Sequence, residues 1–174
     1  MYQEQEDVFY YITVMNENYE HPALPEGEED NIIKGMYSFK KGPDTGKPRV
    51  QLLGSGAIFR EAIAAAELLE KDWGIESDLW SCPSFNELAR NGIETDRINR
   101  LHPEQERQVS HVEKCLKETR GPVIAATDYI RLFSDQIRAY VPRRYVTLGT
   151  DGYGRSDTRE QLRFFFEVDR HFIT

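Results

Sequence analysis

The sequence has 174 residues, of which 39% are hydrophobic and 30% are charged, and its formal net charge is −8. This length and composition are typical of one globular domain. An acidic chain lacks the clustered Lys and Arg that nucleic acids require, and no long apolar span is present, so we expect no nucleic acid or membrane partner and a cytoplasmic location. Cys82 and Cys115 show no metal or redox spacing, and we expect partly or fully buried thiols instead of a disulfide.

The N-terminal region changes character twice. Residues 1–7 are polar and are expected to form a linker, with one domain over 8–174. Residues 8–15, VFYYITVM, predict a strand buried on both faces. Residues 16–30 contain two prolines and six acidic residues, which indicate a long loop or arm.

Four residues at the base of this acidic arm are candidate contacts with another domain or subunit. They are Asn16, Asn18, Tyr19 and His21. Aromatic residues such as tyrosine are enriched at interfaces. A plain solvated loop is the alternative interpretation.

The remaining chain alternates apolar runs with amphipathic segments. This alternation predicts an α/β three-layer sandwich, with a mostly parallel, mixed sheet of about five strands and helices on both faces. Gly74 is the expected C-terminal cap of the first long helix, and Ser84 and Asp128 are expected N-caps of later helices. Further strands are predicted at 36–40, 49–53, 78–82, 121–126 and 146–148, and helices at 57–73, 85–91, 94–101, 110–118, 129–140 and 159–166.

The segment GSGAIF, residues 54–59, follows a predicted strand and opens a predicted helix. Such a turn suits phosphate binding, because the amides at a helix N-terminus favour anions. The dinucleotide fingerprint would require a third glycine where Phe59 stands, and an acid near Cys82 and Pro83. A tight strand-to-helix connection is therefore the favoured interpretation.

Asp128, Asp151 and Asp157 all fall near the expected carboxyl ends of strands. Carboxylates gathered there could perform acid–base chemistry. Helix capping explains Asp128 and Asp157 at least as well, since Asp157 and Glu160 have capping-box spacing. Ser156 is an alternative cap for the same helix.

Arg155 and Arg159 flank these caps. They could pair locally with Asp151 and Asp157, or reach carboxylates of a partner, because arginine suits bidentate pairs at interfaces. Together with Asp151 and Ser156 they are candidate interface or anion-contact residues.

The residues supply no recognisable catalytic or metal motif. The four histidines have no i,i+4 pairing and do not accompany a cysteine in a ligand pattern. There is no GxSxG elbow, and neither cysteine has a histidine in a known catalytic arrangement.

Several blocks, taken together, resemble one enzyme family. They are YYITVMNENYEHPALPEG (10–27), VQLLGSGAIFREAIAAAELL (50–69), SDLWSCPSFNELARNG (77–92), ATDYIRLF (126–133) and GTDGYGRSDTREQLRFFFEVD (149–169). In this order they resemble the C-terminal region of the homodimeric pyruvate dehydrogenase decarboxylase, a transketolase-like thiamine diphosphate enzyme. The resemblance implies a transketolase C-terminal-like domain, truncated here before the family's last helix.

The resemblance also implies where the chemistry lies. The family binds thiamine diphosphate and magnesium between two preceding domains, through a GDG motif followed by NN. This chain has DGYG at 151–154 and no later NN. No catalytic, cofactor or metal residue therefore carries over, and we expect the isolated chain to be inactive.

The implied parent enzyme is an oxidoreductase of central metabolism. It decarboxylates pyruvate oxidatively and transfers the acetyl group to lipoyl on the acetyltransferase component. The implied partners of this domain are the other domains of its subunit, the homodimer partner and the acetyltransferase component. The alternative is a free-standing α/β domain that binds a small anion at a helix N-terminus, near residues 54–56 or Arg155.

Overall fold

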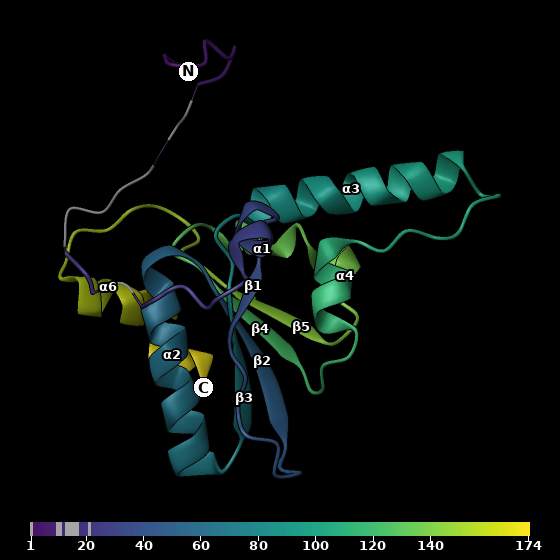
Figure 1. Ribbon diagram of the computed structural model, residues 1–174. Helices are drawn as coiled ribbons and strands as arrows, with labels where there is room; N and C mark the ends of the chain where they lie inside the picture. Colours follow the sequence, from purple (N-terminus) through teal and green to yellow (C-terminus); the bar gives the residue numbers. More distant parts are fainter. Residues whose placement is uncertain (1, 10–11, 13–17, 21) are drawn as a thin grey trace.

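The computed structural model describes residues 2–9, 12, 18–20 and 22–174, and it forms a sheet between two layers of helices (Figure 1). In this described part the sheet has five strands, in the order β1-β3-β2-β4-β5. β1 is antiparallel to β3, and the other neighbouring pairs are parallel. The predicted α/β sandwich with a mixed sheet is confirmed. The strands are β1 (Tyr37–Lys40), β2 (Arg49–Gly54), β3 (Glu76–Ser81), β4 (Val123–Ala126) and β5 (Tyr145–Leu148).

The two faces of the sheet hold separate apolar cores, because successive side chains of a strand point to opposite faces. Leu52 on β2 is fully buried in the core that includes Ala62 of α2. The next residue, Leu53, is fully buried in the other core, with Phe85 of α3 and Leu116 of α4. The helices are α1 (Glu29–Ile33), α2 (Phe59–Leu68), α3 (Phe85–Leu101), α4 (His111–Leu116), α5 (Arg131–Asp135), α6 (Arg159–Phe165) and α7 (Arg170–Ile173).

The first long helix follows its prediction. A 3₁₀ turn at Gly56–Ile58 leads into α2, and a π-helical turn at Leu69–Trp73 completes it. Gly74 ends the segment with φ 63°, in the left-handed region that a C-terminal cap requires. Along the described residues, no helix is both long enough and apolar enough to cross a membrane.

The prediction of two helices over 85–91 and 94–101 is wrong, because α3 is continuous. Ser84 caps it as expected, accepting a hydrogen bond from the Glu87 amide at 3.1 Å. Gly92 does not break the helix: it is buried, and a Cβ there would lie 2.2 Å from the Tyr140 ring. Close packing against that ring explains a glycine inside this helix.

The single helix predicted over 129–140 is also wrong. The chain forms α5 and then a separate 3₁₀ turn at Arg138–Tyr140. The Tyr145 hydroxyl donates to the Ser134 carbonyl at 2.8 Å. The Ser134 carbonyl is the acceptor for the Arg138 amide in a continuous helix, and here it accepts from the Tyr145 side chain.

The strand predicted over 8–15 lies mostly outside the described residues. Of the described ones, Val8, Phe9 and Ile12 are exposed and belong to no strand. Residues 22–28 form a loop that leads into α1. This agrees with the long loop predicted over 16–30, except that α1 already begins at Glu29.

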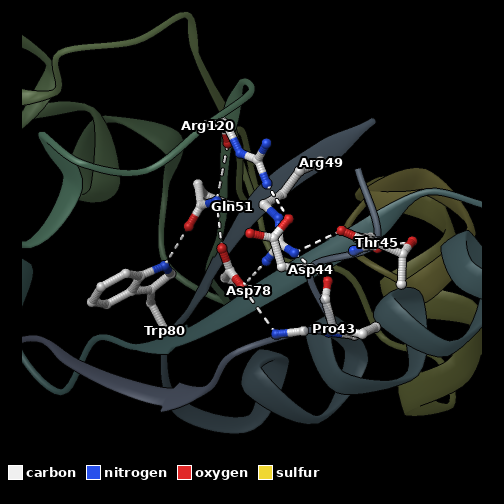
Figure 2. Close-up of polar contacts among 10 residues, drawn as sticks. Pro43, Asp44, Thr45, Arg49, Gln51, Asp78, Trp80 and Arg120 are labelled. Atoms are coloured by element: carbon white, nitrogen blue, oxygen red, sulfur yellow. Dashed lines mark hydrogen bonds and ion pairs between the residues drawn. The ribbon is translucent and has the colours of Figure 1, made fainter. Parts of the chain in front are cut away.

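A buried polar network ties together the amino ends of β2 and β3 (Figure 2). Arg49 donates to Glu76 at 2.6 Å and to Asp78 at 2.5 Å, and its side chain is only 8% exposed. Asp78 also accepts from the Gln51 amide at 2.8 Å. Gln51 in turn accepts from the Trp80 indole at 2.8 Å. The network satisfies polar groups that would otherwise be costly to bury.

The connection between β1 and β2, residues 42–48, is held by the same carboxylates. The Gly42 amide donates to Asp78 at 2.9 Å, and the Thr45 amide donates to Glu76 at 2.8 Å. Hydrogen bonds from Thr45, together with Arg49, lower the pKa of Glu76. The amino edge of the sheet is therefore occupied by structural contacts.

We predict that Gly121→Ala destabilises the fold strongly. Gly121 has φ +80°, and a Cβ there would lie 1.7 Å from the Arg49 carbonyl oxygen. We expect a loss of more than about 2 kcal/mol in the free energy of unfolding, measured by urea denaturation. Gly46→Ala is the matched control, because Gly46 has φ +85° but open space around its Cβ position. Equal losses in the two variants would contradict the steric explanation.

Candidate binding surface at the carboxyl edge of the sheet

The carboxyl ends of the parallel strands meet at one edge of the sheet. The chain passes from β2 to β3 through α2, whereas β4 pairs with the other side of β2. In open α/β sheets such a switch point leaves a crevice in which ligands bind. Ser55 and Thr127, which follow β2 and β4, are buried here and share a hydrogen bond of 2.9 Å.

A cavity of about 420 Å³ opens at this edge. This volume lies within the range of about 300–1,000 Å³ that is typical of small-molecule sites. Its apolar lining includes Ile58 from the turn after β2, Leu162 from α6, and Phe166, the residue that follows α6. Its charged lining includes Asp128 and Arg155, from the turns after β4 and β5. The cavity therefore combines an apolar wall with charges of both signs.

The GSG turn within residues 54–59 is a close-packed connection. A Cβ on Gly54 would lie 2.8 Å from the Cα of Phe59. Gly56 has φ +53°, and a Cβ there would lie 3.4 Å from a carboxylate oxygen of Asp128. An anion at the amides of this turn would face that carboxylate, so the geometry opposes a phosphate site here.

Asp128 does not have the predicted capping role. α5 begins only at Arg131, and its N-cap residue Ile130 makes no side-chain cap. The Thr127 hydroxyl instead accepts from the Tyr129 amide at 3.2 Å and the Thr150 hydroxyl donates to the Asp128 carbonyl at 2.7 Å. These contacts shape the turn and leave the Asp128 carboxylate on the cavity side.

Asp151 is held by an arginine that the sequence did not single out. The backbone amide and the Nε of Arg131 donate to Asp151 at 2.8 Å and 2.5 Å. These hydrogen bonds lower the pKa of the Asp151 carboxyl. The pair anchors the loop after β5 to the start of α5, and Arg155 is not the partner of Asp151.

Arg155 places its guanidinium 5.2 Å from the centre of the Phe165 ring, a cation–π contact. Arg159 lines the same cavity as Arg155. The exposed Ser156 and Asp157 do not cap α6, because Thr158 does, accepting from the Gln161 amide at 3.3 Å. Thr158 and Gln161 also have capping-box spacing, so the motif was ambiguous by one residue.

The described part of the arm lies against α2 and α6. Tyr19 is half-buried, with its ring 4.4 Å from the Arg60 guanidinium and its hydroxyl 3.3 Å from Arg163. Asn18 is exposed. Asn16 and His21, the other two arm candidates, lie outside the described residues.

Glu61 is the residue at this edge that sequence reasoning missed. It is 5% exposed, and its carboxylate accepts from Arg163 at 3.1 Å and from Arg170 at 2.9 Å. Burial acts to raise the pKa of Glu61, but the hydrogen bonds and charges of these arginines outweigh it and lower that pKa. A glutamate on the apolar face of an otherwise Ala-rich helix was the available signal.

His111 and Cys115 form a close pair that is unsuited to nucleophilic catalysis. The Cys115 sulfur is 3.6 Å from Nε2 of His111, but that nitrogen lies 2.9 Å from the Met36 carbonyl, to which it can only donate. Burial raises the pKa of the Cys115 thiol to about 11. Cys82 is also a free, buried thiol, as predicted. Within the described ranges, no group of three or more His, Cys, Asp or Glu could hold a metal ion.

The fold and this edge define an α/β domain with a mixed five-stranded sheet between two layers of helices. Residues 35–169 match the family described as the transketolase-like TK C-terminal domain. The chain belongs to this family.

Relatives and solved structures agree with that assignment. The chain is 68% identical over 175 residues to the pyruvate dehydrogenase E1 component of Cupriavidus necator, covering 100% of this chain and 20% of that protein. The Escherichia coli protein of the same name is 50% identical over 172 residues, covering 98% and 19%. The chain thus spans about a fifth of these relatives. Transketolase from Campylobacter jejuni shares the fold, with a TM-score of 0.52, 18% identity, and coverage of 82% of this chain and 18% of that one.

We predict that the ionised Glu61 carboxylate stabilises the domain at neutral pH and that this stabilisation is lost when the carboxylate is protonated at acidic pH. Its pKa is lowered by folding, so its contribution is present above the ordinary value of 4.5 and is lost as pH falls through the folded value. Glu61→Gln should cost about 1–3 kcal/mol near neutral pH, because two arginines lose their charged partner.

Urea denaturation of both proteins between neutral and acidic pH measures this effect. The difference in stability should shrink as pH falls below 4.5. Glu70→Gln, at an exposed position in the π-helical turn after α2, is the control. A difference for Glu61→Gln that stayed constant with pH would show that the ion pairs contribute nothing.

Proposed function

We propose that this chain serves as the C-terminal domain of a pyruvate dehydrogenase E1 component, with a role in subunit architecture and interfaces. The observation that carries this proposal is the 68% identity along the whole chain to a protein of that name. The parent enzyme would decarboxylate pyruvate oxidatively and transfer the acetyl group to lipoyl on the acetyltransferase component. The proposal assigns residues 8–174 to this domain and 1–7 to a linker.

The residues present do not fit a thiamine diphosphate and magnesium site. The DGYG segment at 151–154 lacks the GDG pattern, and its Asp151 carboxylate is already bound by Arg131. We therefore place the cofactor, and the chemistry that it supplies, in the part of the parent enzyme beyond this chain.

Exposed aromatic side chains support the interface role. Tyr153 is 93% exposed, and Phe164, Phe165 and Phe172 are 60%, 56% and 41% exposed. Aromatic residues on a surface are typical of protein contacts. We assign this surface, with Asn16, Asn18, Tyr19 and His21 of the arm, to contacts with other domains of the same subunit or with the homodimer partner.

We expect the native polypeptide to be about five times the mass of this chain, because the chain spans about 20% of its relatives. An antibody against the 174-residue chain, used on extract of the source cells, would measure that mass. A native band at 20.3 kDa would overturn the proposal.

We also expect thiamine diphosphate with Mg²⁺ to leave the stability of the isolated chain unchanged. The parent enzyme should gain about 2.7 kcal/mol when the cofactor is at 100 times its dissociation constant, since a ligand stabilises only the state that binds it. Thermal or urea denaturation of both proteins, with and without cofactor, is the measurement. Cofactor-dependent stabilisation of the isolated chain would contradict the assignment.

A further inference from the structure

Two opposite charges without ionic partners line the cavity at the carboxyl edge. The first is Asp128, next to Gly56. Among the described residues, no neighbouring side chain forms a hydrogen bond or ion pair with its carboxylate. The Thr150 hydroxyl donates to the main-chain carbonyl of Asp128 and not to its side chain. Partial desolvation raises the pKa of this carboxyl, and the positive charge of Arg163, which is itself bound by Glu61, acts against that rise.

The second charge is Arg155. Its guanidinium contacts the Phe165 ring, and within the described part of the chain no carboxylate pairs with it. The nearby alternatives are already used: Asp151 is bound by Arg131, and Arg163 is bound by Glu61. Arg159 lines the cavity as well, but it has an interaction of its own. Asp128 and Arg155 are therefore the lining charges of opposite sign for which the described residues supply no ion pair.

The space between these charges has an apolar wall. Ile58 is 2% exposed, and Leu162 and Phe166 are half-buried. A phosphate-like dianion would leave Asp128 facing a like charge, and a simple cation would leave Arg155 facing one. A purely apolar ligand would leave both charges desolvated and unpaired.

We propose that this cavity binds a small zwitterion with an aliphatic body, of the class of the apolar α-amino acids. The ligand's ammonium group would bind Asp128, its carboxylate would bind Arg155, and its side chain would pack on Ile58, Leu162 and Phe166. Both polar contacts are charge-assisted, and an apolar pocket with few polar groups is the usual design of such sites. The site adjoins the surface assigned to subunit contacts, because Tyr153 also lines the cavity, but the inference does not depend on that role.

The test uses the 174-residue chain with L-leucine as the probe, followed by amide chemical shifts in NMR spectra. We expect saturable shifts in residues 56–58, 128 and 150–166 at concentrations up to about 10 mM, the range that detects millimolar affinity. N-acetyl-L-leucine, which lacks the ammonium charge, and L-leucinamide, which lacks the carboxylate, should each bind at least about tenfold more weakly.

Two variants test the assigned contacts. Asp128→Asn and Arg155→Gln should each weaken L-leucine binding at least about tenfold, the effect of one charge-assisted hydrogen bond. Both side chains are exposed, so the fold should be retained, which the unchanged remainder of each spectrum would show. Asp72→Asn and Arg97→Gln, at exposed positions outside the cavity lining, are the matched controls and should bind like the parent chain.

Absence of shifts with L-leucine would overturn the proposal. So would shifts that are unaffected by both variants, because the ligand would then lie elsewhere. Equal binding of N-acetyl-L-leucine would overturn the role of Asp128 and thus the zwitterion. Because these readouts use the isolated chain and no enzyme activity, they fail independently of the proposed parent enzyme.

Discussion

The arrangement of the carboxyl edge depends on one buried carboxylate. Glu61 enters the apolar face of α2, where an unpaired charge would be strongly unfavourable. Its two partners, Arg163 and Arg170, come from α6 and α7, about a hundred residues later in the sequence. Pairing them sets the C-terminal helices against α2. Because Arg163 also contacts the Tyr19 hydroxyl, the same interaction positions the described part of the arm.

The two ends of the sheet use polar residues differently. At the amino end, Arg49 pairs with both Glu76 and Asp78, and all three side chains are nearly buried, so these charges have partners within the domain. At the carboxyl end, Arg131 and Asp151 are matched, whereas Asp128 and Arg155 lack ionic partners in the described chain. This contrast agrees with the general behaviour of α/β sheets, in which structural contacts and binding surfaces occupy opposite edges.

The proposed architectural role and the proposed ligand site occupy adjoining surfaces. Aromatic residues of α6 and α7 form an exposed surface, and α6 also supplies Leu162 to the cavity, with Phe166 directly after the helix. Leu162 on α6 thus belongs to the cavity wall, whereas Phe164 and Phe165 of the same helix belong to the exposed surface.

Much of the fold was determined by local sequence. The apolar runs of β2 and β4, the 3.6-residue period of α2 and the caps Gly74 and Ser84 predict their elements because the physical causes lie within a few residues. The family blocks likewise indicated the transketolase-like domain. Only the tertiary structure decided that α3 continues through Gly92, where the Tyr140 ring packs closely. The same is true of α5, which ends at Asp135, beside the Ser134 carbonyl that accepts from Tyr145. The same holds for the site. The pairing of acids with arginines depends on distances between turns that are far apart in the chain. The pairing of Asp151 with Arg131, and the cavity shared by Asp128 and Arg155, could therefore not be derived from spacing alone.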